Sequence, residues 1–139
     1  ISCRAINSKR STLFKIYGIP YMVTLEQVAT AARDYESLQL RSLTQDLLRQ
    51  TARLSDVPRP STTDIQLLAI AASLIELFAL RQKQTPPAWA SDVAPLLEPF
   101  FLVKAAQQMK RLRELCETQS PEPMRKRKLY APPNFLEFV

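Results

Sequence analysis

The sequence predicts an all-α protein, a compact bundle of about four main helices that ends in a short C-terminal helical turn. Three observations lead to this prediction. Glycine occurs once, at Gly18, whereas hairpins and phosphate-binding loops depend on glycine. Ten of the eleven prolines fall in clumps between long stretches of residues that favour helix. Apolar residues within those stretches recur at helical spacing.

The first 21 residues differ from the rest of the chain. They have no acidic residue and no helical periodicity, and their four basic residues are Arg4, Lys9, Arg10 and Lys15. Three interpretations stay open: a basic arm, an import presequence, or sequence upstream of a natural start at Met22. We favour the last, because a helix-capping signal follows Met22 directly. We therefore expect 1–21 to be a basic leader, disordered or upstream of the start, and 22–139 to form a single helical domain.

Two helices are expected within residues 25–54. Thr24 and Gln27 have the spacing of a capping box, in which each side chain bonds to the backbone amide of the other residue. Two apolar stripes follow, and they are out of phase with each other. We therefore predict two helices, joined near Glu36, rather than one long helix. The proline-containing segment 55–61 is predicted to be a loop.

The most apolar helix is predicted over residues 65–84, after a second capping box that starts at Thr63. It is apolar on nearly every side, so we expect it to be buried on every side, at the centre of the core. Its apolar stretch, 67–80, contains Glu76 and is shorter than the ~18–20 residues of a membrane span. We expect no membrane contact.

A last long helix is predicted to begin at Pro99, which suits a first helical turn. Apolar residues then follow at spacings of three and four: Leu102, Ala105, Met109, Leu112 and Cys116. A homo-oligomer built on this stripe stays open as a third alternative. The proline-rich segment 120–123 is expected to end the helix. Asn134 is expected to cap a terminal turn that docks Phe135 and Phe138 on the core.

The residue types exclude most catalytic chemistry. Histidine is absent, and the two cysteines, Cys3 and Cys116, are far apart in the sequence. No nucleophile–base motif is visible, and the closely spaced carboxylates have the pattern of an ordinary helix surface. We therefore expect no enzyme, no catalytic residue, no cofactor and no metal. The cysteine usage suits a reducing cytoplasm.

Aromatic residues outside the predicted helix stripes are candidates for binding another protein. Interfaces favour aromatic anchors with arginine at their rim, although each such residue can instead cap the helical core. The candidate docking residues are Trp89, Phe100, Phe101, Tyr130, Phe135 and Phe138. A protein-interaction module is the function that we favour.

Nucleic-acid binding is the alternative, because four basic residues follow one another near the C-terminus. The candidates for phosphate contact are Lys110, Arg111, Arg125, Lys126, Arg127 and Lys128. Residues 22–139 nevertheless contain 15 basic and 13 acidic residues, and few aromatic residues lie among the basic ones. This balance favours a protein partner.

Four short motifs follow one another in the last ~60 residues. They are Pro86-Pro87-Ala88-Trp89, Leu97-Glu98-Pro99-Phe100-Phe101, Ser120-Pro121-Glu122-Pro123 with its basic run, and Ala131-Pro132-Pro133-Asn134-Phe135-Leu136. Their order resembles small uncharacterised bacterial helical proteins. In that group an aromatic pair with tryptophan is commoner where this chain has Phe100-Phe101. The resemblance implies a bacterial, cytoplasmic, non-enzymatic protein that binds a partner as an antitoxin does.

Overall fold

The structure is a computed structural model that describes residues 22–137. The predictions for residues 1–21 and for Phe138 therefore lie outside the described range. The α-helices are α3 (Leu25–Arg33), α4 (Ser37–Gln50), α5 (Ile65–Arg81), α6 (Lys110–Gln119) and α7 (Glu122–Arg125). The 3-10 helices are η1 (Leu54–Asp56), η2 (Ala88–Asp92) and η3 (Lys104–Gln107), and the strands are β1 (Phe100–Phe101) and β2 (Leu129–Tyr130). The predicted all-α class is confirmed.

Helices α3 and α4 form as two separate helices, as the phase of their stripes predicted. The capping box is present: Thr24 Oγ1 accepts from the Gln27 amide, and Gln27 Oε1 accepts from the Thr24 amide. The chain turns between the helices at Tyr35, which has a φ of 60°. Left-handed backbone is the usual end of a helix, but glycine normally occupies that position.

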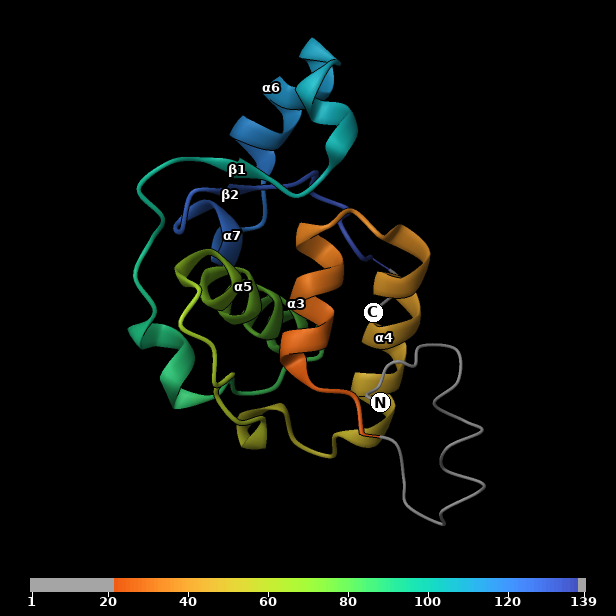
Figure 1. Ribbon diagram of the computed structural model, residues 1–139, viewed down its shortest axis with the longest axis vertical. Helices are drawn as coiled ribbons and strands as arrows, with labels where there is room; N and C mark the ends of the chain where they lie inside the picture. Colours follow the sequence, from red (N-terminus) through yellow and green to blue (C-terminus); the bar gives the residue numbers. More distant parts are fainter. Residues whose placement is uncertain (1–21, 138–139) are drawn as a thin grey trace.

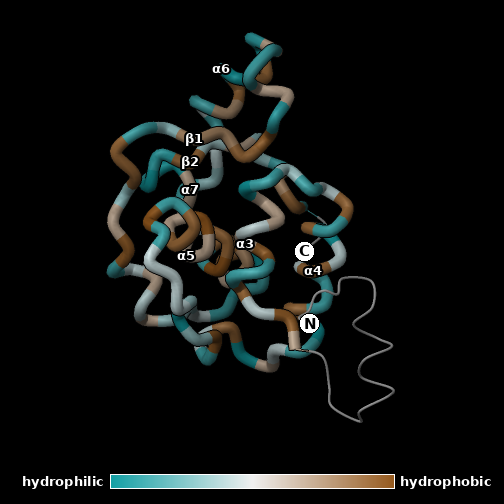
Figure 2. The backbone as a smooth tube through the Cα atoms, in the orientation of Figure 1, coloured by the Kyte–Doolittle hydropathy of each residue, from teal (hydrophilic) through white to brown (hydrophobic). Residues whose placement is uncertain are grey.

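Helix α5 is central, as predicted, and contacts α3, α7, η1 and η2 (Figure 1). Twelve of its residues are buried, and the tube in Figure 2 is mostly brown along it. Two details of the prediction are wrong. Asp64, not Thr63, is the N-cap, because its carboxylate accepts from the amides of Gln66 and Leu67. The helix also ends at Arg81, three residues before the predicted end.

The predicted helix from Pro99 is wrong in its first half. Phe100 and Phe101 form a strand that pairs in parallel with Leu129 and Tyr130. The Phe100 amide donates to the Lys128 carbonyl (3.0 Å), which fixes the register. Phenylalanine and tyrosine favour strands, and a partner strand so far along the chain leaves no trace in local periodicity.

The segment Lys104–Gln119, made of η3 and α6, extends away from the body of the molecule, and we call it the projection (Figure 1). Helix α6 therefore does not pack around α5 as predicted; its main contacts are with η3. Helix α3, in contrast, contacts both α4 and α5. Together, the helices α3, α4 and α5 form the body on which the projection stands.

The C-terminal segment packs on α5 through α7, a short helix that the sequence analysis did not predict. Beyond β2 the chain forms consecutive turns over 133–137 in place of the predicted helical turn. Phe135 is buried in these turns, as expected. Arg81 holds them in place by donating to the Leu136 carbonyl (2.6 Å).

Candidate interaction surface

The first predicted site, the basic run 125–128, is centred on a buried arginine. Arg127 is only 2% exposed, and its Nη1 donates to Glu76 Oε1 (2.6 Å) and to the Pro123 carbonyl (3.0 Å). Its Nη2 and Nε donate to the carbonyls of Ala90 (2.6 Å) and Val93 (3.3 Å). A guanidinium enclosed in this way cannot reach a phosphate, so Arg127 is a structural residue of this fold.

The other three basic residues of the run lie at the surface. Lys126 Nζ lies 3.2 Å from Glu76 Oε1, so this lysine also forms an ion pair with the buried carboxylate. Arg125 and Lys128 are exposed, and each donates to one backbone carbonyl. Arg127 and Lys126 therefore hold the run against α5, and only Arg125 and Lys128 keep their charge available for a partner.

Glu76 is the acceptor at the centre of this cluster. Burial alone would raise the pKa of its carboxyl, but the hydrogen bonds and charges of Arg127 and Lys126 outweigh burial and leave the pKa below its ordinary value. Glu76 is thus ionised and paired at neutral pH. A single acidic residue inside an apolar helix was the signal, in the sequence, that a buried basic partner is needed.

Three of the predicted docking aromatics pack against the main core or within it: Trp89, Phe100 and Phe135. The Trp89 indole donates to the Val57 carbonyl (2.8 Å). The Phe100 ring stacks on Tyr35, with 6.0 Å between ring centroids. These contacts give each of the three a role in folding.

The remaining two, Phe101 and Tyr130, form what we call the outer aromatic pair. Their rings lie 5.5 Å apart at an angle of 39°, and both are partly exposed. Neighbouring residues of a strand point to opposite faces, so this pair faces away from Leu129, which is completely buried. Unlike Phe100, Phe101 does not pack against the main core. The pair is therefore the part of the predicted docking set that is open to a partner.

The projection keeps its apolar side chains apart from the main core. Ala106 and Cys116 are fully buried, but they are not part of the core cluster. Met109 is 56% exposed, and Leu112 and Leu115 are only partly buried. The stripe predicted from the sequence is therefore divided: Leu102 lies in the main core and Cys116 is buried within the projection, whereas Ala105 and Met109 are exposed.

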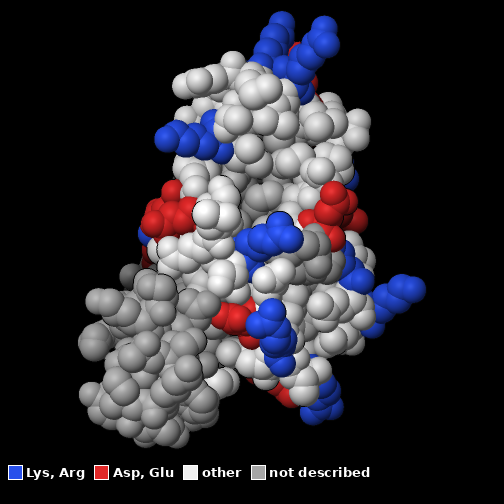
Figure 3. All heavy atoms as spheres, turned by 90° about the vertical axis from the view of Figure 1, so that its right-hand side faces the viewer, with Lys and Arg blue, Asp and Glu red and all other residues white. Residues whose placement is uncertain are grey.

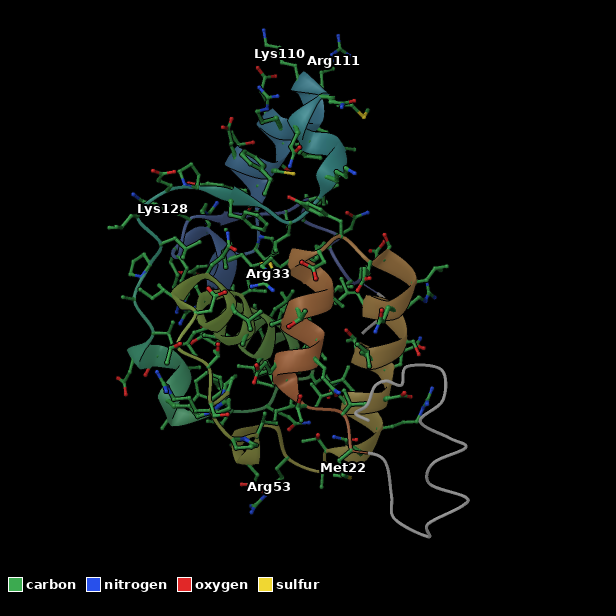
Figure 4. The ribbon with its side chains drawn as sticks, in the orientation of Figure 1. Met22, Arg33, Arg53, Lys110, Arg111 and Lys128 are labelled. Atoms are coloured by element: carbon green, nitrogen blue, oxygen red, sulfur yellow. The ribbon has the colours of Figure 1, made fainter. Side chains whose placement is uncertain are left out.

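The free end of the projection is basic. Figure 3 shows lysine and arginine side chains extending from this end of the molecule. Lys110 and Arg111 point away from the body at the start of α6, at the opposite end of the molecule from Arg53 (Figure 4). Lys104 is exposed at the start of η3. Within residues 22–137, none of Lys104, Lys110 and Arg111 forms an ion pair.

Side-chain hydrogen bonds fix the projection in place. Arg113 donates to the carbonyls of Ala106 (3.0 Å) and Gln107 (2.6 Å), which joins α6 to η3. The Tyr35 hydroxyl donates to the Phe101 carbonyl (3.0 Å) and accepts from the Gln107 side chain (3.2 Å). Tyr35 and Gln107 were not among the predicted site residues, because no local sequence pattern reveals a contact across 72 positions.

A hollow of about 440 Å³ lies between the projection and the body. Its lining is mostly apolar, and among the described residues it includes Tyr35, Leu40, Leu102, Lys104, Ala105 and Phe135. A second hollow, of about 520 Å³, lies beside the start of α3 and the loop that contains Pro58, and no predicted site residue lines it. The first hollow adjoins the projection and can accept an apolar side chain.

Burial raises the pKa of the Cys116 thiol, and the charge of Glu117 raises it further. This thiol is therefore protonated at neutral pH.

Within residues 22–137, no group of three metal-ligating side chains comes together, and no helix has the length and apolarity needed to cross a bilayer.

Comparison with family models, with curated proteins and with solved structures finds no match to this chain. The parts of the described chain that are open to a partner are the outer aromatic pair, the projection and the hollow between projection and body.

Proposed function

We propose that this protein is a non-enzymatic protein-interaction module that binds its partner as an antitoxin does. One observation carries the proposal: the outer aromatic pair, Phe101 and Tyr130, lies partly exposed at the base of a projection whose apolar side chains remain outside the main core. Aromatic residues dominate the binding energy of protein interfaces when a partner covers them.

The rigidity of this region supports the same proposal. The bonds from Tyr35 to Phe101 and to Gln107 hold the pair and the projection in one arrangement before any partner arrives. Ordering an interface on binding reduces affinity, so a surface that is already ordered binds more tightly. The hollow beside Tyr35 offers a place for one apolar side chain of the partner.

Nucleic-acid binding through the basic run is the weaker alternative. Arg127 is buried and Lys126 is paired with Glu76, so only Arg125 and Lys128 of the run remain for phosphates. The other predicted phosphate contacts, Lys110 and Arg111, lie at the far end of the projection, away from Lys128 (Figure 4), so the exposed cations are dispersed and supply little of the electrostatic affinity on which such binding depends. The resemblance of the last ~60 residues to small bacterial helical proteins adds a bacterial cytoplasm as the proposed location.

The test is affinity capture of the tagged full chain from an extract of its own host, with and without nuclease. The unsubstituted chain is compared with Phe101→Ala/Tyr130→Ala and with Leu38→Ala. Leu38 is the control because it is 87% exposed on α4 and does not line the hollow between projection and body. Thermal melting of each variant shows whether the fold is intact.

We expect the unsubstituted chain to capture a stoichiometric protein partner in the presence of nuclease. Leu38→Ala should retain this partner. The aromatic double variant should lose it although its own melting temperature is unchanged. Loss of every captured species on nuclease treatment would overturn the proposal in favour of nucleic acid. Equal capture by all three chains would show that the outer aromatic pair is not the docking site.

A further inference from the structure

The positive charge of the folded chain is concentrated on the projection. Residues 22–139 contain 15 basic and 13 acidic residues, and Lys104–Gln119 alone contains four basic and two acidic residues. The projection thus accounts for the whole excess, and the remainder of 22–139 is balanced. No acidic residue occurs between Glu98 and Glu114, so the first turn of α6, at the free end of the projection, contains basic residues and no acidic one.

Three of these cations have no function inside the fold. Lys104, Lys110 and Arg111 are exposed and form no ion pair within the described part of the chain, whereas Arg33 and Arg49 pair with aspartates. Lys110 and Arg111 also stand in the first turn of α6, where no acidic residue is present. Cations there oppose the helix dipole, so their position does not stabilise the helix.

Apolar surface accompanies this charge. Met109 is 56% exposed directly before Lys110, and Leu112 follows one turn later, partly exposed. Lys104 lines the hollow of about 440 Å³ together with Leu102 and other apolar residues. Phosphate groups gain nothing from an exposed methionine, whereas a protein segment that carries both carboxylates and apolar side chains matches both features.

We propose that the projection binds an acidic amphipathic segment of the partner protein. Its carboxylates meet Lys104, Lys110 and Arg111, and its apolar side chains cover Met109 and enter the hollow. The inference rests on the proposed protein-binding function and adds the chemistry of the partner. A second copy of this chain is disfavoured, because a symmetric contact through the projection brings like charges together.

The test follows backbone amide resonances of the isotope-labelled full chain by NMR during titration with a synthetic 15-residue peptide of glutamate and leucine at helical spacing. The same peptide with glutamine in place of glutamate is the charge control. The variant Lys110→Glu/Arg111→Glu is compared with Arg53→Glu/Arg59→Glu, which makes the same charge change. Arg53 lies at the other end of the molecule (Figure 4), and Arg59 lines the same hollow as Arg53.

We expect saturable shifts within residues 104–115 with the glutamate peptide and none with its glutamine analogue. Reversal at Lys110 and Arg111 should weaken binding about tenfold or more, whereas reversal at Arg53 and Arg59 should change it less than about twofold. Shifts that appear in neither the projection nor the lining of the hollow, or equal effects of the two double variants, would overturn the inference. So would stronger shifts of the same amides by single-stranded DNA or by phosphatidylserine vesicles.

This inference and the proposed function fail separately. Suppose that capture of a protein partner resists nuclease and requires Phe101 and Tyr130, but does not require Lys110 and Arg111. That result would uphold the protein-binding function and overturn the inference that the partner binds through an acidic segment.

Discussion

At the scale of single residues, the pair of Arg127 and Glu76 joins segments that are 51 positions apart. The guanidinium also bonds to three backbone carbonyls, from Ala90, Val93 and Pro123. A buried pair of this kind is not a net gain over a well-packed apolar pair, but removal of one partner leaves an uncompensated charge. Removal of either Arg127 or Glu76 alone should therefore destabilise the fold, because the other charge is left buried without its partner.

Glu76→Gln should lower the free energy of unfolding by about 3 kcal/mol at pH 7. Because the pKa of Glu76 in the fold lies below the value of 4.5 expected without interactions, its stabilisation is present above about pH 4.5 and is lost as the pH falls through the folded value. In urea denaturation experiments from pH 7 to pH 3, the free energies of unfolding of the unsubstituted protein and of Glu76→Gln should become equal as the pH falls. The exposed Glu98→Gln is the control, and a constant difference at every pH would contradict this explanation.

Left-handed residues are a second feature at this scale. Lys83 follows α5 with a φ of 57° and carries an ordinary surface side chain, whereas Tyr35 has the same conformation and several contacts. Lys83→Gly should raise the stability by about 1 kcal/mol, because a Cβ opposes this conformation. Tyr35→Gly should lower it, because the hydroxyl bonds and the ring stack are lost. If chemical denaturation shows that both substitutions raise the free energy of unfolding, the contacts of Tyr35 contribute little to stability.

At the scale of elements, local signals predicted α3, α4 and α5 well. The capping box at Thr24 and the apolar run of α5 act over a few neighbouring residues, so sequence alone reveals them. The strand at Phe100 and Phe101 could not be predicted, because its partner lies 29 positions away. The same limit applies to the site. The sequence identified all of these aromatic residues as candidates. It could not show that Phe101 and Tyr130 are partly exposed while the others pack against the core, because that difference depends on tertiary packing.

The projection depends on Arg113, which joins its two helices. Arg113→Gln should speed amide hydrogen exchange in residues 104–109 about tenfold while the unfolding of the body stays nearly unchanged, since the lost bonds lie outside the main core. Arg111→Gln, two residues earlier and free of such bonds, is the matched control. Unchanged exchange in Arg113→Gln would mean that η3 and α6 hold together without it.

At the scale of the whole molecule, the body is completed by its last described segment. Leu129, Met124 and Arg127 are all completely or almost completely buried, and they cover α5 from a part of the chain that lies after the projection. The helices α3, α4 and α5 on their own would leave Glu76 without its partners.

A chain that ends after Pro121 should therefore lose cooperative unfolding and bind a hydrophobic dye, as followed by circular dichroism and fluorescence. Adding Glu76→Leu to the shortened chain should restore part of the cooperativity, because the buried charge is then removed. A sharp melting transition of the shortened chain without this substitution would show that the C-terminal segment is dispensable for the body.

The position of Arg127 also has a consequence for biosynthesis. The ribosome delivers α5, with its buried carboxylate, about fifty residues before the guanidinium that neutralises it. During that interval the apolar faces of α5 have their first neighbour, α3, but lack α7. A newly made chain of this protein therefore cannot complete its core until the segment that contains Arg127 has emerged from the ribosome.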